Sequence, residues 1–252
     1  LLGGLTFINV RDRSGLIQVV IQEKKEGEKL RGMQIGTVLS VTGKVKKEER
    51  APGGAELHGP EITVLVPVTD EPPIEIDKPL LHKSENLDTL FDNRAIGLRN
   101  LQEQDIFKVK SGVCESIRAY AKENEFTEIH TPKLLAEATE GGAEVFSLDY
   151  FGKTAVLAQS AQFYKQMMVG VFERVLEIGS TYRAEPSATT RHLTEFLTVD
   201  CEIGYTTFEE LQNFVGGMLI RVSDDAYKNH EDAFKKWNVV KADSPEKPQD
   251  IP

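Results

Sequence analysis

The sequence reads TYRAE at residues 181–185 and TRHLTEF at residues 190–196, with the polar stretch PSAT between them. We expect the two stretches to form antiparallel strands joined by this polar loop, with two arginines, a histidine and a phenylalanine on one hairpin. Guanidinium groups on such a hairpin can bind phosphate oxygens, and an aromatic ring beside them can stack on a purine. A charge ladder on an exposed hairpin would explain the first stretch alone, but not both stretches at this spacing. The pattern therefore predicts a nucleotide site.

The residues around this hairpin predict a mixed sheet with covering helices. Apolar residues recur at steps of three and four from Ile106 to Tyr120, which indicates an amphipathic helix over residues 105–124. Further strands are expected over residues 126–130, 154–158, 175–178 and 196–205, and further helices over residues 161–172 and 208–229. The tail, residues 241–252, holds three prolines and is expected to form a loop.

The first part of the chain has the pattern of a β-barrel. Strands are expected over residues 5–11, 16–22, 38–46 and 61–68, with a short helical piece near residues 29–33. A five-stranded barrel would need one more strand before residue 1, so we expect a truncated start. Residues 69–100 contain two adjacent prolines and little periodicity, and are expected to be a linker. The predicted α+β organisation is a barrel domain at 1–68, a linker at 69–100 and a second domain at 101–252.

Composition favours two domains and excludes a membrane protein. The 252 residues are 40% apolar, and no run approaches the roughly 18 apolar residues of a membrane span, so a cytoplasmic protein is expected. The net charge is -10, but residues 1–68 carry ten Lys and Arg against eight Asp and Glu. A mildly basic first domain suits local contact with nucleic acid, and ordinary charge scatter explains it equally well. Cys114 and Cys201 lie in apolar segments and are expected to be buried free thiols.

The hairpin resembles motif 2 of the class II aminoacyl-tRNA synthetases, in the subgroup for aspartate, asparagine and lysine. Residues 126–132, FTEIHTP, resemble motif 1, whose proline, here Pro132, lies at the dimer interface in that family. The resemblance implies a homodimer with a class II antiparallel-sheet catalytic domain. It also implies an ATP site formed by Arg183, Glu185, Arg191, His192, Leu193 and Phe196.

A second segment indicates which amino acid is bound. Residues 159–166, QSAQFYKQ, are similar to the aspartyl enzymes' Gln-Ser-Pro-Gln-x-x-Lys-Gln, with Ala161 in place of proline. Ser160 is expected to cap the helix, and Gln162 and Lys165 to share one of its faces. A buried ammonium opposite the substrate carboxylate would select L-aspartate. Taken alone, Lys165 would be read as a solvated helix lysine.

Two further positions match residues around the bound amino acid in this family. Residues 139–142, TEGG, resemble the mobile loop that closes over aspartate, where Glu140 would meet the substrate ammonium. Asp200, on the strand after motif 2, matches a family position near the substrate amino group. Arg183 would also contact the substrate. A plain turn and an aspartate at the edge of the core are the alternatives.

Residues 6–18, TFINVRDRSGLIQ, resemble the anticodon-binding OB fold. Phe7 matches the aromatic residue that stacks on an anticodon base, Gln18 the amide that reads a base edge, and Glu56 a carboxylate at the first two anticodon positions. Without the resemblance, Phe7 would be a core residue. In archaeal-type aspartyl enzymes a lysine before this glutamate is associated with rejection of the asparagine anticodon, and Pro52 takes its place here. Turn chemistry explains Pro-Gly-Gly at residues 52–54 equally well. The resemblance therefore implies that tRNA(Asp) and also tRNA(Asn) are partners.

The resemblance implies an aspartate-tRNA ligase, with a C-terminal part that is absent. Motif 3 does not occur in the 252 residues, and the ligands of Mg2+ are expected downstream, so this fragment alone should not form the adenylate. Three alternatives remain. Lys165 argues against an asparaginyl-tRNA synthetase, and the barrel domain argues against a related asparagine synthetase. A non-catalytic tRNA-binding paralogue fits the missing motif.

Overall fold

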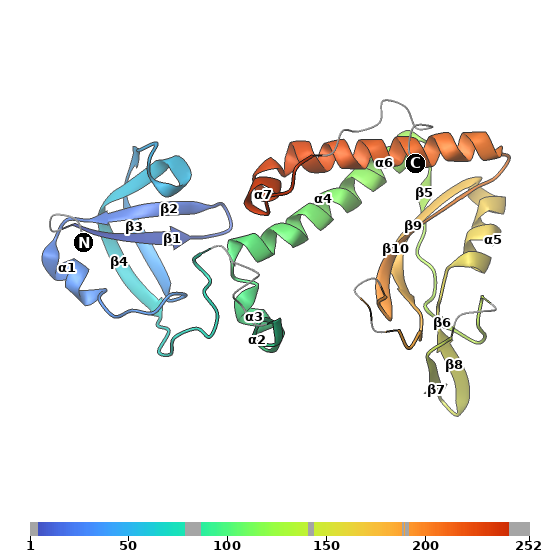
Figure 1. The fold of residues 1–252 in the computed structure, drawn as a ribbon, viewed down its shortest axis with the longest axis horizontal. Helices are drawn as coiled ribbons and strands as arrows, with labels where there is room; N and C mark the ends of the chain where they lie inside the picture. Colours follow the sequence, from blue (N-terminus) through green and yellow to red (C-terminus); the bar gives the residue numbers. More distant parts are fainter. Residues whose placement is uncertain (1–4, 79–86, 141–143, 188, 190–191, 242–252) are drawn as a thin grey trace. The chain divides into compact units, whose positions relative to one another are not determined.

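The computed structural model describes residues 5–78, 87–140, 144–187, 189 and 192–241, in a mixed α and β fold (Figure 1). Two compact units divide the chain, one ending at Gln104 and the other beginning at Asp105. The predicted start before residue 5 and the tail after Lys241 lie outside the described residues.

The first unit contains an open four-stranded sheet with an apolar interior. Its strands are β1 (Thr6–Arg11), β2 (Leu16–Ile21), β3 (Val38–Lys47) and β4 (Ala55–Val66), in the order β1-β2-β4-β3. The β2 and β4 strands are parallel, and the other neighbours are antiparallel. Alternate residues face inward, so that Val19, Ile21 and Leu57 are buried against Ile8 and Val10. The opposite face of the same strands carries the polar side chains of Asn9, Gln18 and Glu56 together with Phe7 and Val20.

Two predicted elements of this unit were misplaced. The last strand begins at Ala55 and not at residue 61, because Gly59-Pro60, a pair typical of turns, lies inside it. Gly59 has φ +59, and the register with β3 shifts between Thr42 and Lys44, which accommodates the pair as an irregularity of the ladder. The helix α1 covers Lys24–Lys29 rather than residues 29–33. Gly27 has a low helix propensity, which hid this helix in the sequence. A glycine is needed there because a Cβ atom at this position would collide with the Thr6 side chain.

The described part of residues 69–100 contains two short helices and an apolar cluster of its own. The helices are α2 (Leu87–Asp92) and α3 (Arg94–Gly97), and Ile74 and Leu90 are buried together. The Asn100 amide donates hydrogen bonds to the carbonyls of Glu75 at 3.2 Å and Lys78 at 2.6 Å. These contacts order part of the segment that composition alone indicates as a linker.

The second unit pairs two sheets with long helices. A three-stranded sheet has the order β10 (Glu195–Ile203), β9 (Arg174–Tyr182), β5 (Thr127–Glu128), and another has the order β6 (Leu134–Leu135), β8 (Lys153–Leu157), β7 (Ser147–Tyr150). The helices are α4 (Leu101–Glu123), α5 (Gln162–Phe172), α6 (Phe208–Asn229) and α7 (Glu231–Lys236). Figure 1 shows α4 and α6 side by side, and the Ser116 hydroxyl donates to Asp225 across them at 2.7 Å. Ile117 and Ala121 of α4 pack on Leu176 and Ile178 of β9, beside both half-buried free cysteines.

The helix α6 begins and ends where periodicity predicts. Thr207 caps it, because its hydroxyl accepts from the Glu210 backbone at 3.3 Å while the Glu210 carboxylate accepts from the Thr207 backbone at 2.7 Å. In this unit β6, β7 and α7 were not predicted, and the strand expected over residues 126–130 has only two paired residues. Each missed element spans two to six residues, which gives periodicity little to detect.

Candidate functional site

One face of β9 and β10 carries two of the residues singled out from sequence, Phe196 and Asp200. The cross-strand pairs on this face are Thr181 with Phe196, Gly179 with Thr198, and Glu177 with Asp200. The alternate residues Leu176 and Ile178 face α4 and α6 instead. Strand alternation therefore separates an apolar face, which holds the sheet on the helices, from a polar face, which is the candidate site.

Lys165 lies over this polar face among acidic side chains. Its side chain is 8% exposed, and its Nζ atom is 2.8 Å from Asp200 Oδ1 and 3.7 Å from Glu202 Oε2. The Thr198 hydroxyl donates to the second Asp200 oxygen at 2.9 Å. The cation can bind a carboxylate, and the acidic pair around it leaves excess negative charge for an ammonium group. Lys165 is therefore not the solvent-exposed helix lysine that it would be taken for in isolation.

The segment before Lys165 approaches the candidate lid. The Glu140 backbone donates to Gln159 Oε1 at 3.4 Å, so Glu140 lies beside the start of α5. The first residue outside the helix is Ala161 rather than Ser160, so the predicted cap was placed one residue early. Ser160 still contributes, because its hydroxyl accepts from the Gln162 backbone at 3.1 Å. The lid glycines at positions 141 and 142 lie outside the described residues.

Arg183 and Phe196 meet at the base of the hairpin. The Arg183 guanidinium carbon is 5.6 Å from the centroid of the Phe196 ring, and the Arg183 backbone donates to the Thr194 carbonyl at 3.0 Å. Within the described part of the chain, the buried Arg183 Nε atom has no hydrogen-bond partner. A buried donor without an acceptor is costly, so this group is suited to an anionic ligand.

The remaining hairpin residues are placed around the loop. His192 Nδ1 lies 2.6 Å from the Thr189 hydroxyl, Leu193 is exposed, and Glu185 is half-buried. Arg191 lies outside the described residues. The structure thus brings Arg183 and Phe196 together and places His192 beside the loop, and their roles at a phosphate and purine site stay a prediction.

The acidic residue Glu177 belongs to this site and was missed from sequence. It is buried, it accepts from the Thr131 backbone and hydroxyl at 2.9 and 2.8 Å, and it lies 3.0 Å from Lys133 Nζ. These contacts join the stretch around Pro132, which is exposed, to the middle of β9. A glutamate inside the apolar run VLEI was the signal that could have found it.

The outer face of the first unit brings together Phe7, Gln18 and Glu56. One row across the four strands is Asn9, Gln18, Glu56 and Lys46, and the next is Phe7, Val20, His58 and Lys44. Phe7 is 38% exposed on this face. The alternative interpretation of Phe7 as a core residue is therefore wrong. Pro52 begins the turn before β4. Asn9, His58, Lys44 and Lys46 were not predicted, although a period of two from the neighbouring positions would have included them.

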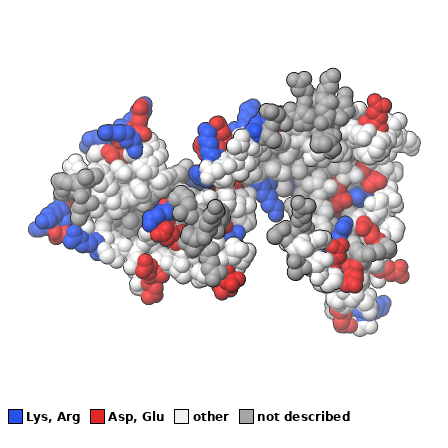
Figure 2. Space-filling model, in the orientation of Figure 1, with Lys and Arg blue, Asp and Glu red and all other residues white. Residues whose placement is uncertain are grey.

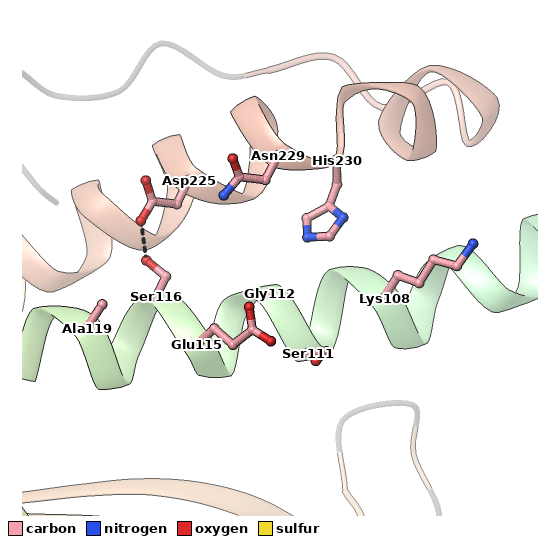
Figure 3. Close-up of a pocket in the computed structure, with 9 residues that line it drawn as sticks. All are labelled: Lys108, Ser111, Gly112, Glu115, Ser116, Ala119, Asp225, Asn229 and His230. Carbon is pink, nitrogen blue, oxygen red and sulfur yellow. Dashed lines mark hydrogen bonds between the residues drawn. The ribbon is translucent and has the colours of Figure 1, made fainter. Parts of the chain in front are cut away.

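A groove of about 530 Å³ lies elsewhere, between α4 and α6, and contains none of the predicted site residues (Figure 3). Asp225 and Ser116 line it, already bonded to each other. Among the described residues, no group of three or more His, Cys, Asp or Glu could hold a metal ion. In the same part of the chain, no helix is both long and apolar enough to cross a membrane. On the face drawn in Figure 2, acidic and basic side chains are interspersed on both units.

Two family models cover most of the chain. Residues 2–65 match the OB-fold nucleic acid binding domain, and residues 86–248 match the class II tRNA synthetases for D, K and N. Both matches agree with the fold and with the predicted resemblance.

Similar proteins support the same family. A protein of Archaeoglobus fulgidus named aspartate--tRNA(Asp/Asn) ligase is 38% identical over 98% of this chain and 58% of its own length. One of the same name from Thermus thermophilus is 39% identical over 100% of this chain and 57% of its own length. The chain thus spans little more than half the length of these relatives.

Solved structures of this family share the fold. Asparaginyl-tRNA synthetase of Pyrococcus horikoshii, in complex with asparaginyl-adenylate, matches with a TM-score of 0.84 and 29% identity, over 93% of this chain and 54% of that one. Aspartyl tRNA synthetase of Entamoeba histolytica matches with a TM-score of 0.72 and 26% identity, over 93% of this chain and 51% of that one. The chain therefore belongs to the class II tRNA synthetases, in the group for aspartate, lysine and asparagine.

Proposed function

We propose that the protein is an aspartate-tRNA ligase, which activates L-aspartate with ATP and transfers it to tRNA(Asp) and tRNA(Asn) in the cytoplasm. The observation that carries the proposal is the buried ammonium of Lys165, held 2.8 Å from Asp200 on the polar face of the sheet. The names of the relatives from Archaeoglobus fulgidus and Thermus thermophilus support it.

Lys165 gives the site its choice of amino acid. Its ammonium faces the side-chain carboxylate of aspartate, while the acidic group of Glu140, Asp200 and Glu202 receives the substrate ammonium. Asparagine would bring a neutral amide to the same position and leave the buried lysine charge without its anion. Such a mismatch costs several kcal/mol, which is enough for strong discrimination.

Adenylate formation needs orientation and charge neutralisation rather than a protein nucleophile. An oxygen of the substrate α-carboxylate attacks the α-phosphorus of ATP, and the bond to the pyrophosphate oxygen breaks. Arg183, whose Nε donor is buried without a partner among the described residues, neutralises the α-phosphate. Phe196 stacks on adenine with the ring face that Arg183 leaves open, while Glu185 orients the nucleotide. We propose that His192 and Arg191 hold the outer phosphates, with Leu193 in the same segment of the ATP site.

Aminoacyl transfer then uses the terminal adenosine of the tRNA, whose hydroxyl oxygen attacks the activated carbonyl and releases AMP. ATP chemistry of this kind normally involves Mg2+, but the described residues offer no acidic cluster that fits the ion. The steps above describe only the side chains of this chain, and we propose that Mg2+ accompanies the bound ATP. We further propose that Pro132 lies at the interface of a homodimer, since it is exposed beside residues that Glu177 anchors.

Recognition of both tRNAs follows from the outer face of the barrel. Phe7 supplies a stacking surface, and Gln18 and Glu56 supply a donor and acceptors for base edges. Pro52, at the turn before Glu56, has no side-chain donor that could form a hydrogen bond with the third anticodon base. The two tRNAs differ at that base, so their rates of aspartylation should be similar.

Asparaginyl-tRNA synthetase is the second candidate, because the Pyrococcus horikoshii enzyme has the same fold with asparaginyl-adenylate bound. The deciding experiment charges transcripts of tRNA(Asp) and tRNA(Asn) with radiolabelled aspartate or asparagine, using the full-length protein. The proposal expects aspartate on both transcripts and asparagine on neither. Asparagine on tRNA(Asn) alone would establish the second candidate. A preference for tRNA(Asp) above about a hundredfold, near 2.7 kcal/mol, would refute the dual specificity.

A further inference from the structure

The carboxylate of Glu56 is held from both sides. Gln18 Nε2 lies 2.9 Å from one oxygen, and His58 Nε2 lies 2.8 Å from the other. A carboxylate only accepts hydrogen bonds, so both nitrogen atoms donate, and His58 does so through its Nε2–H. Glu56 and His58 have side chains that are 16% and 20% exposed, which leaves the pair partly covered but open to a ligand. The plane of the carboxylate is thereby fixed.

The pair lies in the middle of the outer face rather than in the barrel core. Glu56 is opposite Gln18 and His58 is opposite Val20, while Leu57 between them points into the core. Phe7 lies in the same row as His58, on the far side of Val20. The residues that hold the carboxylate are therefore the neighbours of the proposed stacking platform.

Base readout by a carboxylate depends on where its lone pairs point. An exposed glutamate rotates freely and can accept from any donor, whereas a carboxylate fixed on both oxygens offers its remaining lone pairs in set directions. Such an acceptor recognises the amino and imino donors on the Watson–Crick edge of an unstacked base. Fixing the acceptor also lowers the entropy lost on binding.

We propose that His58 is a positioning residue for anticodon recognition: it orients the Glu56 carboxylate so that this group discriminates between bases. The inference rests on the proposed function of the barrel face. Lys44, which lies opposite His58 on β3, is exposed and carries the charge that suits the RNA backbone. In this row, His58 thus serves base readout by orienting Glu56, whereas Lys44 serves phosphate contact.

The test compares two amides of different length at position 58. In His58→Gln the side-chain nitrogen reaches the place of Nε2 and keeps the donor, whereas in His58→Asn it is too short to reach Glu56. Aspartylation by the full-length protein is measured as kcat/KM for a transcript with the natural anticodon and for transcripts substituted at each of the first two anticodon bases. Glu56→Gln and the double variant Glu56→Gln with His58→Asn complete the series, and Lys44→Gln is the control.

We expect His58→Asn to reduce discrimination against the substituted bases by about tenfold, as Glu56→Gln does, with no additional loss in the double variant. His58→Gln should recover most of the discrimination. Lys44→Gln should lower kcat/KM by a similar factor for every transcript, because a phosphate contact carries no base information. Thermal unfolding of each variant checks that the barrel is intact.

An equal fall in kcat/KM for all transcripts in His58→Asn would overturn the proposal, since a merely structural histidine would act in this way. Additive losses in the double variant, or no recovery in His58→Gln, would do the same. If His58→Asn did not fold, His58→Phe would replace it with the same expected and contrary results. Absence of aspartate-dependent pyrophosphate exchange in the wild type would refute the proposed function instead.

Discussion

Replacement of Lys165 with methionine removes the buried ammonium while keeping a side chain of similar length. In the structure this ammonium is 2.8 Å from Asp200 and 3.7 Å from Glu202, and only 8% of the side chain is exposed. Breaking a buried ion pair by removing one partner costs about 3–5 kcal/mol of stability. Asp200 is 19% exposed and keeps its bond from Thr198, so we expect a cost near the lower end of that range.

The effect on activity should be specific to the amino acid. Aspartate would lose its buried counter-ion, so kcat/KM for aspartate should fall by about a hundredfold or more, near 2.7 kcal/mol, while KM for ATP stays close to its wild-type value. The ratio of kcat/KM for aspartate to that for asparagine should fall with it. Pyrophosphate exchange in the full-length protein, at varied aspartate, asparagine and ATP, measures all three quantities.

Lys236→Met is the matched control. Lys236 also lies 2.8 Å from a buried carboxylate, that of Asp105, but outside the polar face of the sheet. This variant should lose stability without a change in the aspartate to asparagine ratio. If Lys165→Met and Lys236→Met both lowered exchange with the two amino acids equally, Lys165 would be a structural lysine and the selection argument would be wrong.

Three further variants or measurements test other parts of the account. Phe7→Ala should weaken tRNA binding by about 1–3 kcal/mol in a filter-binding assay and leave pyrophosphate exchange unchanged, because Phe7 is exposed and is the proposed stacking surface. A variant that unfolds but binds normally in its folded fraction would contradict this. Ser116→Ala should lower the free energy of unfolding in urea by about 1 kcal/mol at pH 7, since it removes the bond to Asp225. The Ser116 hydroxyl, and secondarily Arg221, hold the pKa of Asp225 below its usual value. The stabilisation by the ionised Asp225 carboxylate is therefore fully present above the ordinary carboxyl pKa and is lost as pH falls through the lowered pKa of Asp225. The deficit of Ser116→Ala should therefore shrink in acid, and a deficit independent of pH would contradict the linkage. Burial, and secondarily Asp200, raises the pKa of Cys201 to about 11, so this thiol should resist alkylation at pH 7, and rapid labelling of Cys201 in the folded protein would contradict its burial.

Long periodic segments and contiguous motifs were predictable from sequence. The α6 helix was predicted at Phe208–Asn229, and the structure adds a capping box at Thr207 and Glu210 that fixes its start. Phe196 and Arg183 were predicted together because a hairpin brings residues on either side of one loop into contact. Both inferences depend on interactions between residues close in sequence.

Contacts between distant segments were not predictable in the same way. Glu177 holds Thr131 across 46 positions, and only the parallel pairing of β5 with β9 places them together. His58 contacts Glu56 only two positions away in sequence. The parallel pairing of β2 with β4, however, decides that both residues lie beside Gln18 and Val20 on the outer face. Sequence alone shows the residue types in these cases, while the strand register decides which of them share a face.

Selection of aspartate is the central claim, and amino-acid-dependent exchange of pyrophosphate into ATP by the wild-type full-length protein measures it most directly. The account predicts exchange with L-aspartate and at most about a hundredth of that kcat/KM with L-asparagine, because only a carboxylate pairs with the Lys165 ammonium. Efficient exchange with asparagine, whether or not aspartate also supports exchange, would contradict the selection of aspartate by Lys165.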